Sequence, residues 1–248
     1  MKISVITATY NSVATVRDTL VSIRQQDHPD IEHIIVDGRS TDGTLEVVAG
    51  FPHIARIISE KDKGIYDAMN KGIGMATGEV IGILNSDDVY IDATVLSTVA
   101  KAFANPQVMT VYADLQYVDP ENLDRVQRTW ITGRFRKNSF YYGWMPPHPT
   151  FFVRREVYER IGLFNTDLRS AADYELMLRV LLRYDISTYY IPRVIVKMRA
   201  GGVSNATLLN RLRANREDRL AWKLNGLKPY FFTLYLKPLR KITQFINT

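Results

Sequence analysis

Short apolar segments alternate with amphipathic ones through the first 115 residues, and this alternation constrains the fold more than any other feature of the chain. Five apolar runs are expected to form strands: 3–8, 32–37, 54–59, 79–84 and 108–113. Four segments between them have helical spacing of apolar residues: 13–26, 44–50, 65–76 and 93–104. Strands that alternate with helices favour a doubly wound α/β sheet in which most strands are parallel.

After residue 114 the alternation of expected strands and helices becomes less regular. Short strands are expected at 115–118 and 125–131, before an aromatic, proline-rich loop at 140–152. Further helices are expected at 155–161, 171–183 and 206–223, and further strands at 186–191 and 194–198. No segment has the length and composition of a flexible linker, so the sequence indicates no clean domain boundary.

The composition narrows the class of protein. With 248 residues, 46% of them hydrophobic, the chain is long enough to bury a core without help from disulfides. It has no cysteine, which excludes thiolate metal sites, iron–sulfur clusters and thiol nucleophiles, and favours a reducing, cytoplasmic location. No signal peptide is recognised, and prolines and a glycine interrupt the longest uncharged stretch, 138–153, so no membrane span is expected.

Positive charge is concentrated at the C-terminal end. Residues 211–248 carry nine Lys or Arg against two acidic residues, a net +7, which leaves −1 for the rest of a chain whose formal charge is +6. Aromatic residues are interspersed with these cations, a pattern that suits attachment to an anionic membrane surface. A helix that packs on the body with its basic face in water is the alternative. A near-neutral body argues against nucleic acid as a partner.

Polar residues follow four of the expected strands, in segments 9–11, 37–44, 60–64 and 85–88. Because ligands of open α/β sheets bind outside the carboxyl ends of the strands, we expect these four loops to converge on one crevice. A Walker A motif is absent, and Gly72–Gly78 is one residue too long for a dinucleotide-binding glycine motif.

Several carboxylates in this pattern have both a structural and a chemical interpretation. Asp87 and Asp88 are adjacent after a buried strand, where they either form a solvated turn or hold Mg²⁺ or Mn²⁺. Asp37 either accepts a hydrogen bond from a base or ribose, or satisfies amides of its own loop. Asp173 is near the start of a helix, where it either stabilises the helix N-terminus or acts as a general base.

The segments that carry these residues resemble family 2 glycosyltransferases of the GT-A fold, the inverting enzymes that build bacterial surface polysaccharides. The resemblance extends from residue 3 to about 205, and its motifs are 4–11, 35–44, 60–72, 76–79, 84–88 and 172–175. Each motif is weak alone, but their order and spacing together are specific.

The resemblance implies a nucleotide-diphosphate sugar donor and a Mn²⁺ or Mg²⁺ ion that bridges its diphosphate. It implies donor-binding roles for Thr9, Asn11, Asp37, Asp62, Lys63 and Asp87. Asp88 would hold the cation. Asp173 would deprotonate the acceptor hydroxyl for a single inverting displacement.

The sequence departs from the family pattern at two places. Asn85-Ser86-Asp87 stands where Asp-x-Asp is expected, so either Asp88 carries the metal or the dependence on a cation is weaker than usual. Gly38 stands where many relatives have an acidic residue, and Arg39 is bulky. These two residues leave the base open, with uridine favoured over guanosine and thymidine.

The resemblance also suggests how the chain is divided. A catalytic domain is expected at 1–205, with a nucleotide-sugar half at 1–115 and an acceptor half at 116–205, followed by a basic helical extension at 206–248. Trp144 and His148 are the candidate contacts for a saccharide or polyprenyl-linked acceptor, although loop aromatics are more often packed. A catalytically inactive nucleotide-sugar-binding or scaffold protein of the same fold is the alternative function. Residues 201–204 resemble a loop that closes over the donor in some relatives.

Overall fold

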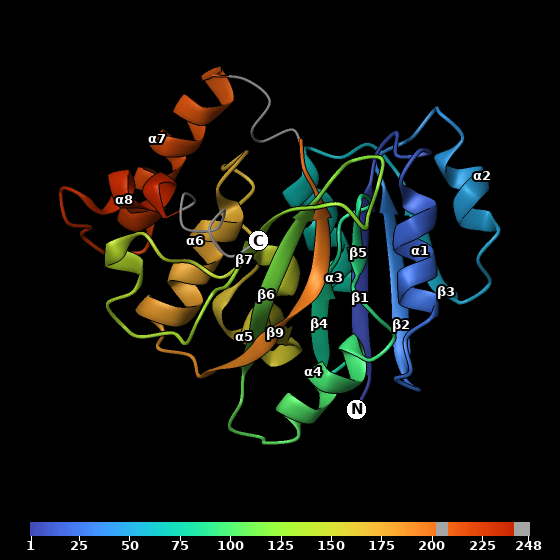
Figure 1. Ribbon diagram of the computed structural model, residues 1–248, viewed down its shortest axis with the longest axis horizontal. Helices are drawn as coiled ribbons and strands as arrows, with labels where there is room; N and C mark the ends of the chain where they lie inside the picture. Colours follow the sequence, from blue (N-terminus) through green and yellow to red (C-terminus); the bar gives the residue numbers. More distant parts are fainter. Residues whose placement is uncertain (202–207, 241–248) are drawn as a thin grey trace.

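The structure is a computed structural model that describes residues 1–201 and 208–240, with side chains of the second range described from residue 213 (Figure 1). The strands of the described residues are β1 (Ile3–Thr9), β2 (Ile31–Asp37), β3 (Ile54–Ser59), β4 (Val80–Ile83), β5 (Asp88–Tyr90), β6 (Thr110–Val118), β7 (Val126–Trp130), β8 (Phe152–Arg154) and β9 (Thr188–Arg199). They form one sheet of order β3-β2-β1-β4-β8-β6-β9-β5, with β7 paired to β6.

The sheet is mixed, with its parallel core where the sequence predicts it. β1 pairs in parallel with both β2 and β4, and β2 pairs in parallel with β3. β6 and β9 are also parallel, whereas β8 is antiparallel to its neighbours β4 and β6. The α/β class and the mostly parallel sheet are therefore confirmed, and the carboxyl ends of β1 to β4 meet at one edge.

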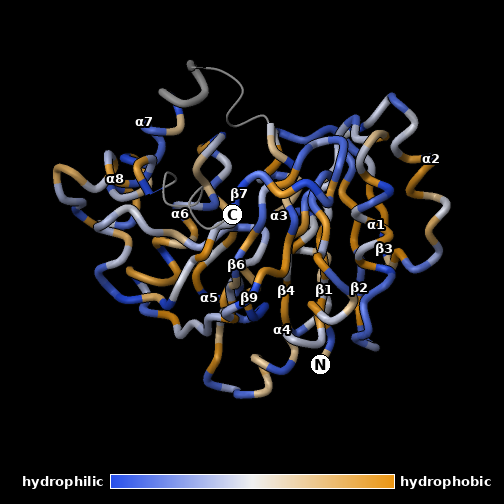
Figure 2. The backbone as a smooth tube through the Cα atoms, viewed as in Figure 1, coloured by the Kyte–Doolittle hydropathy of each residue, from blue (hydrophilic) through white to orange (hydrophobic). Residues whose placement is uncertain are grey.

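Helices cover both faces of this sheet. They are α1 (Val16–Arg24), α2 (Thr44–Ala49), α3 (Ile65–Met75), α4 (Val95–Phe103), α5 (Arg155–Ile161), α6 (Ala172–Leu178), α7 (Leu208–Leu224) and α8 (Thr233–Leu239). Buried residues of α1 and α4 pack on one face, and those of α3, α5 and α6 pack on the other. The tube in Figure 2 is accordingly most hydrophobic along the central strands.

Close packing of α3 against β1 depends on Gly72. A Cβ at this position would lie 2.4 Å from Ile6 Cγ2, well inside van der Waals contact. The absent side chain therefore lets α3 approach the sheet, and α3 in turn fixes the loop that precedes it.

Several elements differ from the sequence-based expectation. The strand β8 begins at Phe152, the last residue of the expected loop 140–152, and β5 begins at Asp88, which the sequence places in a loop. Both strands are three residues long, so their pairing is set by tertiary neighbours rather than by local pattern. The two strands expected at 186–191 and 194–198 are the single strand β9, and the helix expected at 171–183 changes from α to π geometry at Arg179.

The C-terminal helices pack on the body through α6 and the 140–142 turn. Trp222 of α7 is fully buried, and its indole N–H donates to the Tyr174 hydroxyl at 2.9 Å. The Thr233 hydroxyl at the start of α8 donates to the Tyr141 carbonyl at 2.7 Å. In the part of the chain that the structure describes, no helix is both long and apolar enough to cross a bilayer. Residues 202–204 of the expected closing loop lie outside the described residues.

Candidate active site

The loops after β1, β2 and β4 are joined by hydrogen bonds. The Thr41 amide donates to Asn11 Oδ1 at 2.9 Å, and the Asn11 amide donates to Ser40 Oγ at 2.8 Å. The hydroxyls of Ser12 and Ser86 are 2.9 Å apart. These contacts bring three of the four predicted polar loops to one edge of the sheet, and Asn11 adopts the left-handed conformation (φ +48°) that its short polar side chain tolerates.

Asp37 stabilises the loop that follows β2. Its buried carboxylate accepts hydrogen bonds from the Ser40 amide at 3.0 Å, from Ser40 Oγ at 2.5 Å and from Ser59 Oγ at 2.6 Å. This is the loop-capping role that the sequence left open for Asp37. A carboxylate has about four acceptor positions, so three of those of the fully buried Asp37 are occupied.

The loop after β3 contributes Asp62 and Lys63. Asp62 Oδ1 is 2.6 Å from the Lys71 ammonium, and Asp62 Oδ2 would be only 3.1 Å from a Cβ at Gly38. Gly38 thus leaves the space that brings the third loop against the second. The Lys63 side chain is exposed, while its backbone N–H donates to Asp67 Oδ2. Nearby Thr9 is buried, and its hydroxyl has no partner within the described residues.

Asp87 and Asp88 differ sharply in environment. Asp87 is half-buried, whereas Asp88 is 1% exposed at the start of β5. Burial, together with the neighbouring Asp87 carboxylate, raises the pKa of Asp88 well above its usual range. Asp88 Oδ2 accepts from the Asn85 side-chain amide at 3.2 Å, but Asp88 Oδ1 has no partner among the described residues.

These oxygens suit a divalent cation whose remaining ligands come from a substrate. The donor set is hard, with two carboxylates and the Asn85 amide oxygen, which is also buried without a partner in the described ranges. No cluster of three or more His, Asp or Glu that would hold a metal by itself occurs within residues 1–201 and 208–240. Cations bound by one or two carboxylates plus substrate phosphates need no such cluster.

Asp173 lies in the first turn of α6 and is held by two side chains from other elements. The Tyr66 hydroxyl donates to Asp173 Oδ1 at 3.1 Å, and His148 Nδ1 is 3.5 Å from Asp173 Oδ2. The carboxylate is 18% exposed, so it is both accessible and fixed. This is the arrangement that a general base requires.

His148 connects Asp173 to the loop after β4, residues 85–88, which we call the acidic loop. Its Nε2 is 3.2 Å from the Asn85 side-chain nitrogen, which also donates to Asp88. Burial lowers the pKa of His148 and the carboxylates of Asp173 and Asp87 raise it, with a net lowering. The structure therefore aligns Asp88, Asn85, His148 and Asp173 in one chain of polar contacts.

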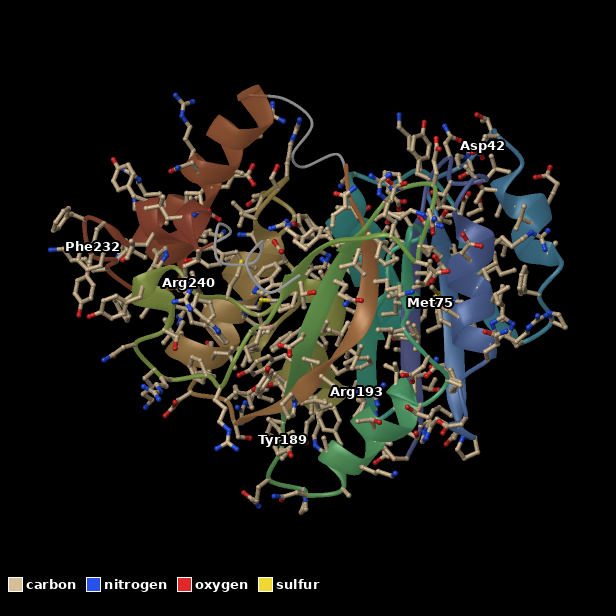
Figure 3. The ribbon with its side chains drawn as sticks, viewed as in Figure 1. Asp42, Met75, Tyr189, Arg193, Phe232 and Arg240 are labelled. Carbon is tan, nitrogen blue, oxygen red and sulfur yellow. The ribbon has the colours of Figure 1, made fainter. Side chains whose placement is uncertain are left out.

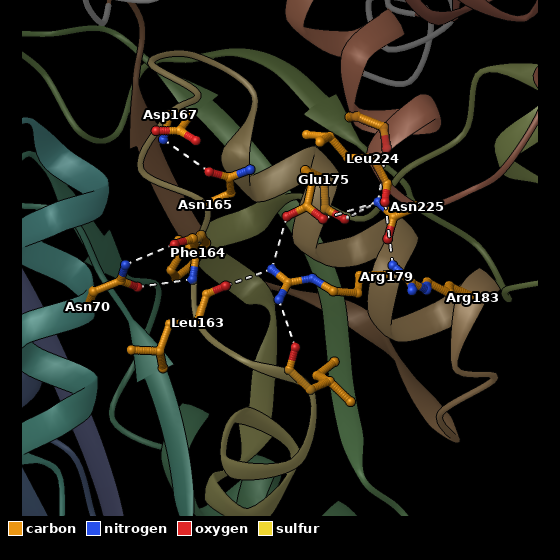
Figure 4. Close-up of polar contacts among 12 residues, drawn as sticks. Asn70, Leu163, Phe164, Asn165, Asp167, Glu175, Arg179, Arg183, Leu224 and Asn225 are labelled. Atoms are coloured by element: carbon orange, nitrogen blue, oxygen red, sulfur yellow. Dashed lines mark hydrogen bonds and ion pairs between the residues drawn. The ribbon is translucent and has the colours of Figure 1, made fainter.

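The helix that carries Asp173 is fixed by a second polar network (Figure 4). Glu175 pairs with Arg179 at 2.9 Å, and Arg179 also donates to the carbonyls of Ile161 and Leu163. Asn225, just after α7, donates to the carboxylate and the carbonyl of Glu175. With its charges paired in this way, α6 holds Asp173 in a defined position against α3.

Trp144 does not present an acceptor surface. It is 5% exposed, and its indole N–H donates to the Thr132 carbonyl at 2.7 Å. Its ring packs edge-on against Tyr112 and Phe140 in the largest hydrophobic cluster. The structure places Trp144 in the core, which corrects the expectation of a stacking contact with a sugar.

Sequence reasoning assigned no role to Tyr66, Asn85 or Arg199. Tyr66 and Asn85 lie within the recognised motifs, but only the fold shows that they contact Asp173 and His148. Arg199, 7% exposed at the end of β9, donates to the Asp87 carbonyl at 2.8 Å and pairs with Asp18 at 2.5 Å. No local pattern indicates that a residue so distant in sequence supports the acidic loop.

The family model and the relatives that match this sequence agree on one family. The family model for glycosyl transferase family 2 matches residues 4–162. A relative from Mycobacterium bovis, named PGL/p-HBAD biosynthesis glycosyltransferase, is 31% identical over 207 residues, which are 82% of this chain and 78% of that one. A Mycobacterium tuberculosis relative, named as an uncharacterised glycosyltransferase, is 33% identical over 183 residues, which are 73% of this chain and 69% of that one.

Solved structures share the fold at lower identity. TarS 1–349 of S. aureus, in complex with UDP-GlcNAc, has a TM-score of 0.70 and 19% identity, covering 91% of this chain and 66% of that chain. The mannosyltransferase PcManGT from Pyrobaculum calidifontis, in complex with GDP-Man and Mn²⁺, has a TM-score of 0.67 and 23% identity, covering 95% and 68%. The chain described here spans only 43% of another solved TarS chain.

Proposed function

We propose, because this chain belongs to glycosyl transferase family 2, that it transfers a sugar from a nucleotide-diphosphate sugar to a hydroxyl of a saccharide or lipid-linked saccharide, with inversion. The observation that carries the proposal is the fixed, accessible carboxylate of Asp173, held by Tyr66 and His148 beside the acidic loop. Such an arrangement places a base next to the site of a departing diphosphate.

The donor would bind along the joined loops at the carboxyl ends of the strands. The residues proposed to contact it are Thr9, Asn11, Asp37, Asp62, Lys63 and Asp87. Support comes from the unpartnered hydroxyl of Thr9 and from the bonds that fix Asn11 and the loop of Asp37. We favour a UDP-sugar, as in the solved complex of TarS, with a GDP-sugar as the alternative.

The reaction would be one displacement. The acceptor oxygen forms a bond to the anomeric carbon, the bond from that carbon to the diphosphate oxygen breaks, and the acceptor proton passes to Asp173. Mn²⁺ or Mg²⁺ held by Asp88, with Asp87 beside it, would neutralise charge on the departing diphosphate. Because attack occurs opposite the leaving group, the anomeric configuration inverts.

Slow donor hydrolysis tests this proposal without knowledge of the acceptor. UDP-glucose, UDP-GlcNAc and GDP-mannose, each with Mn²⁺, are incubated with the protein and followed by proton NMR. We expect at least one α-linked donor to release its nucleotide and to give the β sugar first, because water takes the place of the acceptor. Release of the α sugar first, or no consumption of any donor, would contradict the proposal.

We also propose that the C-terminal aromatic surface attaches the protein to an anionic membrane that presents the acceptor. This surface consists of Tyr142, Tyr230, Phe231, Phe232 and Tyr235. Phe231 is 89% exposed, and the exposed cations Lys228 and Arg240 belong to the same C-terminal segment, in which Figure 3 labels Phe232 and Arg240. Aromatic anchors next to Lys and Arg favour the interface of a negatively charged bilayer.

Sedimentation with phosphatidylglycerol vesicles tests the surface. The double variant Phe231→Ser and Tyr235→Ser should bind at least several-fold less than the parent chain, since both side chains are exposed and their loss leaves the core unchanged. Tyr189→Ser is the matched control, because Tyr189 is also exposed but lies at a distant edge of the molecule (Figure 3). Equal binding of the double variant and the control would contradict membrane attachment through this surface.

A further inference from the structure

The imidazole of His148 lies between two elements of the candidate site and contacts a polar group on each side. Its Nε2 is 3.2 Å from the side-chain nitrogen of Asn85, in the loop after β4. Its Nδ1 is 3.5 Å from Asp173 Oδ2, on α6. Hydrogen bonds to a base are often long in the absence of substrate and tighten in the complex.

The backbone of His148 is held rigidly. Pro147 and Pro149 flank it, and the residues form a short 3-10 turn, His148–Thr150. The buried Thr150 hydroxyl bonds to the carbonyls of Pro147 and Ala113. The imidazole of His148 therefore projects from a rigid, hydrogen-bonded turn rather than from the tip of a loop.

The partners of the two ring nitrogens define where the proton is. The Asn85 amide nitrogen donates to Asp88 and faces His148 Nε2, so Nε2 is the acceptor. The single proton of the neutral ring is then on Nδ1, which faces Asp173 Oδ2 at 3.5 Å. A small cavity beside these two residues is lined mostly by apolar side chains, among them Met69, Phe151 and Leu176, and the low dielectric of this lining strengthens the contact.

We propose that His148 is the positioning residue of the general base: its Nδ1–H orients Asp173 Oδ2, while its Nε2 ties that orientation to Asn85 in the acidic loop. Tyr66 already holds Asp173 Oδ1, so the two side chains together fix both oxygens of the carboxylate. The base would then be in place only when the loop that borders the donor is also in place. This inference rests on the proposed function in so far as Asp173 is the base.

Two substitutions distinguish the role of Nδ1 from the role of Nε2. In His148→Asn the amide occupies the place of Nδ1 and keeps a donor for Asp173, whereas in His148→Gln it occupies the place of Nε2 and loses that donor. We expect His148→Gln to lower the kcat of donor hydrolysis by about 10- to 100-fold with little change in the KM for the donor, as for other positioning partners. His148→Asn should keep at least tenfold more kcat than His148→Gln. The control is His28→Gln, since His28 is half-buried and contacts the Met1 carbonyl outside the site.

A packing role for His148 gives a different result. If shape alone mattered, the two variants would lose activity equally, or donor KM and kcat would change together. If the ring had no role, neither variant would lose activity. Each of these three outcomes would overturn the proposal.

The ring tautomer tests the inference without any catalytic assay. Nitrogen-15 NMR of the imidazoles distinguishes Nδ1–H from Nε2–H, and His148→Gln identifies the signals of His148 among the four histidines. We expect Nδ1–H in the parent chain and a shift away from it in Asp173→Ala. Nε2–H in the parent chain, or an unchanged tautomer in Asp173→Ala, would contradict the contact even if the protein proves to be an active transferase.

Discussion

The Tyr66 hydroxyl donates a hydrogen bond to Asp173 Oδ1 at 3.1 Å, although 107 positions separate the two residues in the sequence. Tyr66 is in the first turn of α3, next to the third polar loop, and its ring stacks on Phe164 with centroids 5.5 Å apart. Burial and the Asp173 carboxylate raise the pKa of Tyr66 well above its usual range, so the hydroxyl stays protonated and donates. A side chain of α3 thus helps to position the carboxylate on α6.

Tyr66→Phe removes this donor and keeps the stacked ring. We expect turnover to fall roughly tenfold, which corresponds to about 1.4 kcal/mol, a typical contribution of a hydrogen bond to a charged group. The melting temperature should change little because the ring contact is retained. Steady-state kinetics of Tyr66→Phe beside Tyr184→Phe, an exposed tyrosine, makes the comparison. Identical rates for the two variants would show that the bond has no catalytic role.

Asp173→Asn keeps the size of the side chain and an oxygen acceptor for Tyr66. An amide does not take up the proton of the acceptor hydroxyl. We therefore expect turnover to fall by a factor on the order of 10²–10⁴, the usual contribution of a general base. Donor affinity should remain close to that of the parent chain. Single-turnover transfer and calorimetric donor binding give the two quantities, and full turnover would refute the assignment of Asp173.

Asp87→Asn and Asp88→Asn test the acidic loop. Each removes one hard carboxylate, so the part of donor binding that depends on Mn²⁺ should weaken about tenfold or more. Folding should be retained, particularly for Asp88→Asn, since burial already disfavours the charged form of that residue. Asp30→Asn, exposed just before β2, is the control. Mn²⁺-dependent binding that survives both changes would exclude this loop as the cation site.

Because His33 is buried, we expect the free energy of unfolding to decrease in acid. Burial and the neighbouring His53 lower the pKa of His33 from 6.5 to about 3. Between these values the unfolded chain binds a proton that the folded chain does not, so the free energy of unfolding falls as the pH falls below 6.5. At pH 5 the loss from this group is about 2 kcal/mol.

His33→Gln should flatten this pH dependence, because the amide does not titrate. Urea unfolding at several pH values between 7 and 4 measures the slopes for the parent chain, for His33→Gln and for the half-buried control His28→Gln. The same slope in all three proteins would mean that His33 is not the group responsible.

Much of the parallel core was predictable because its signals are local. The run of apolar residues in β1, β2 and β3 and the helical spacing of α3 place each element within a few residues of the expected bounds. A buried parallel strand has a nearly continuous apolar pattern, which is readable without knowledge of its neighbours.

The elements that were missed depend on tertiary contacts. β5 and β8 are three residues long. β5 forms because β9 offers it hydrogen bonds, and β8 forms because β4 and β6 offer them on its two sides. The same holds in the site: the sequence indicates Asp173 and the acidic loop separately, but not that Asn85 and His148 connect them. Trp144 illustrates the opposite error, since an aromatic residue of the proline-rich loop, expected to contact the acceptor, is a core side chain.

The most direct test of the account is a calorimetric titration of the protein with UDP, GDP and dTDP, each with and without Mn²⁺. We predict that one diphosphate, with UDP favoured, binds in a cation-dependent way, and that Asp88→Asn removes the dependence. Absence of binding by all three diphosphates in the presence of Mn²⁺ would contradict a nucleotide-sugar site at the carboxyl ends of these strands.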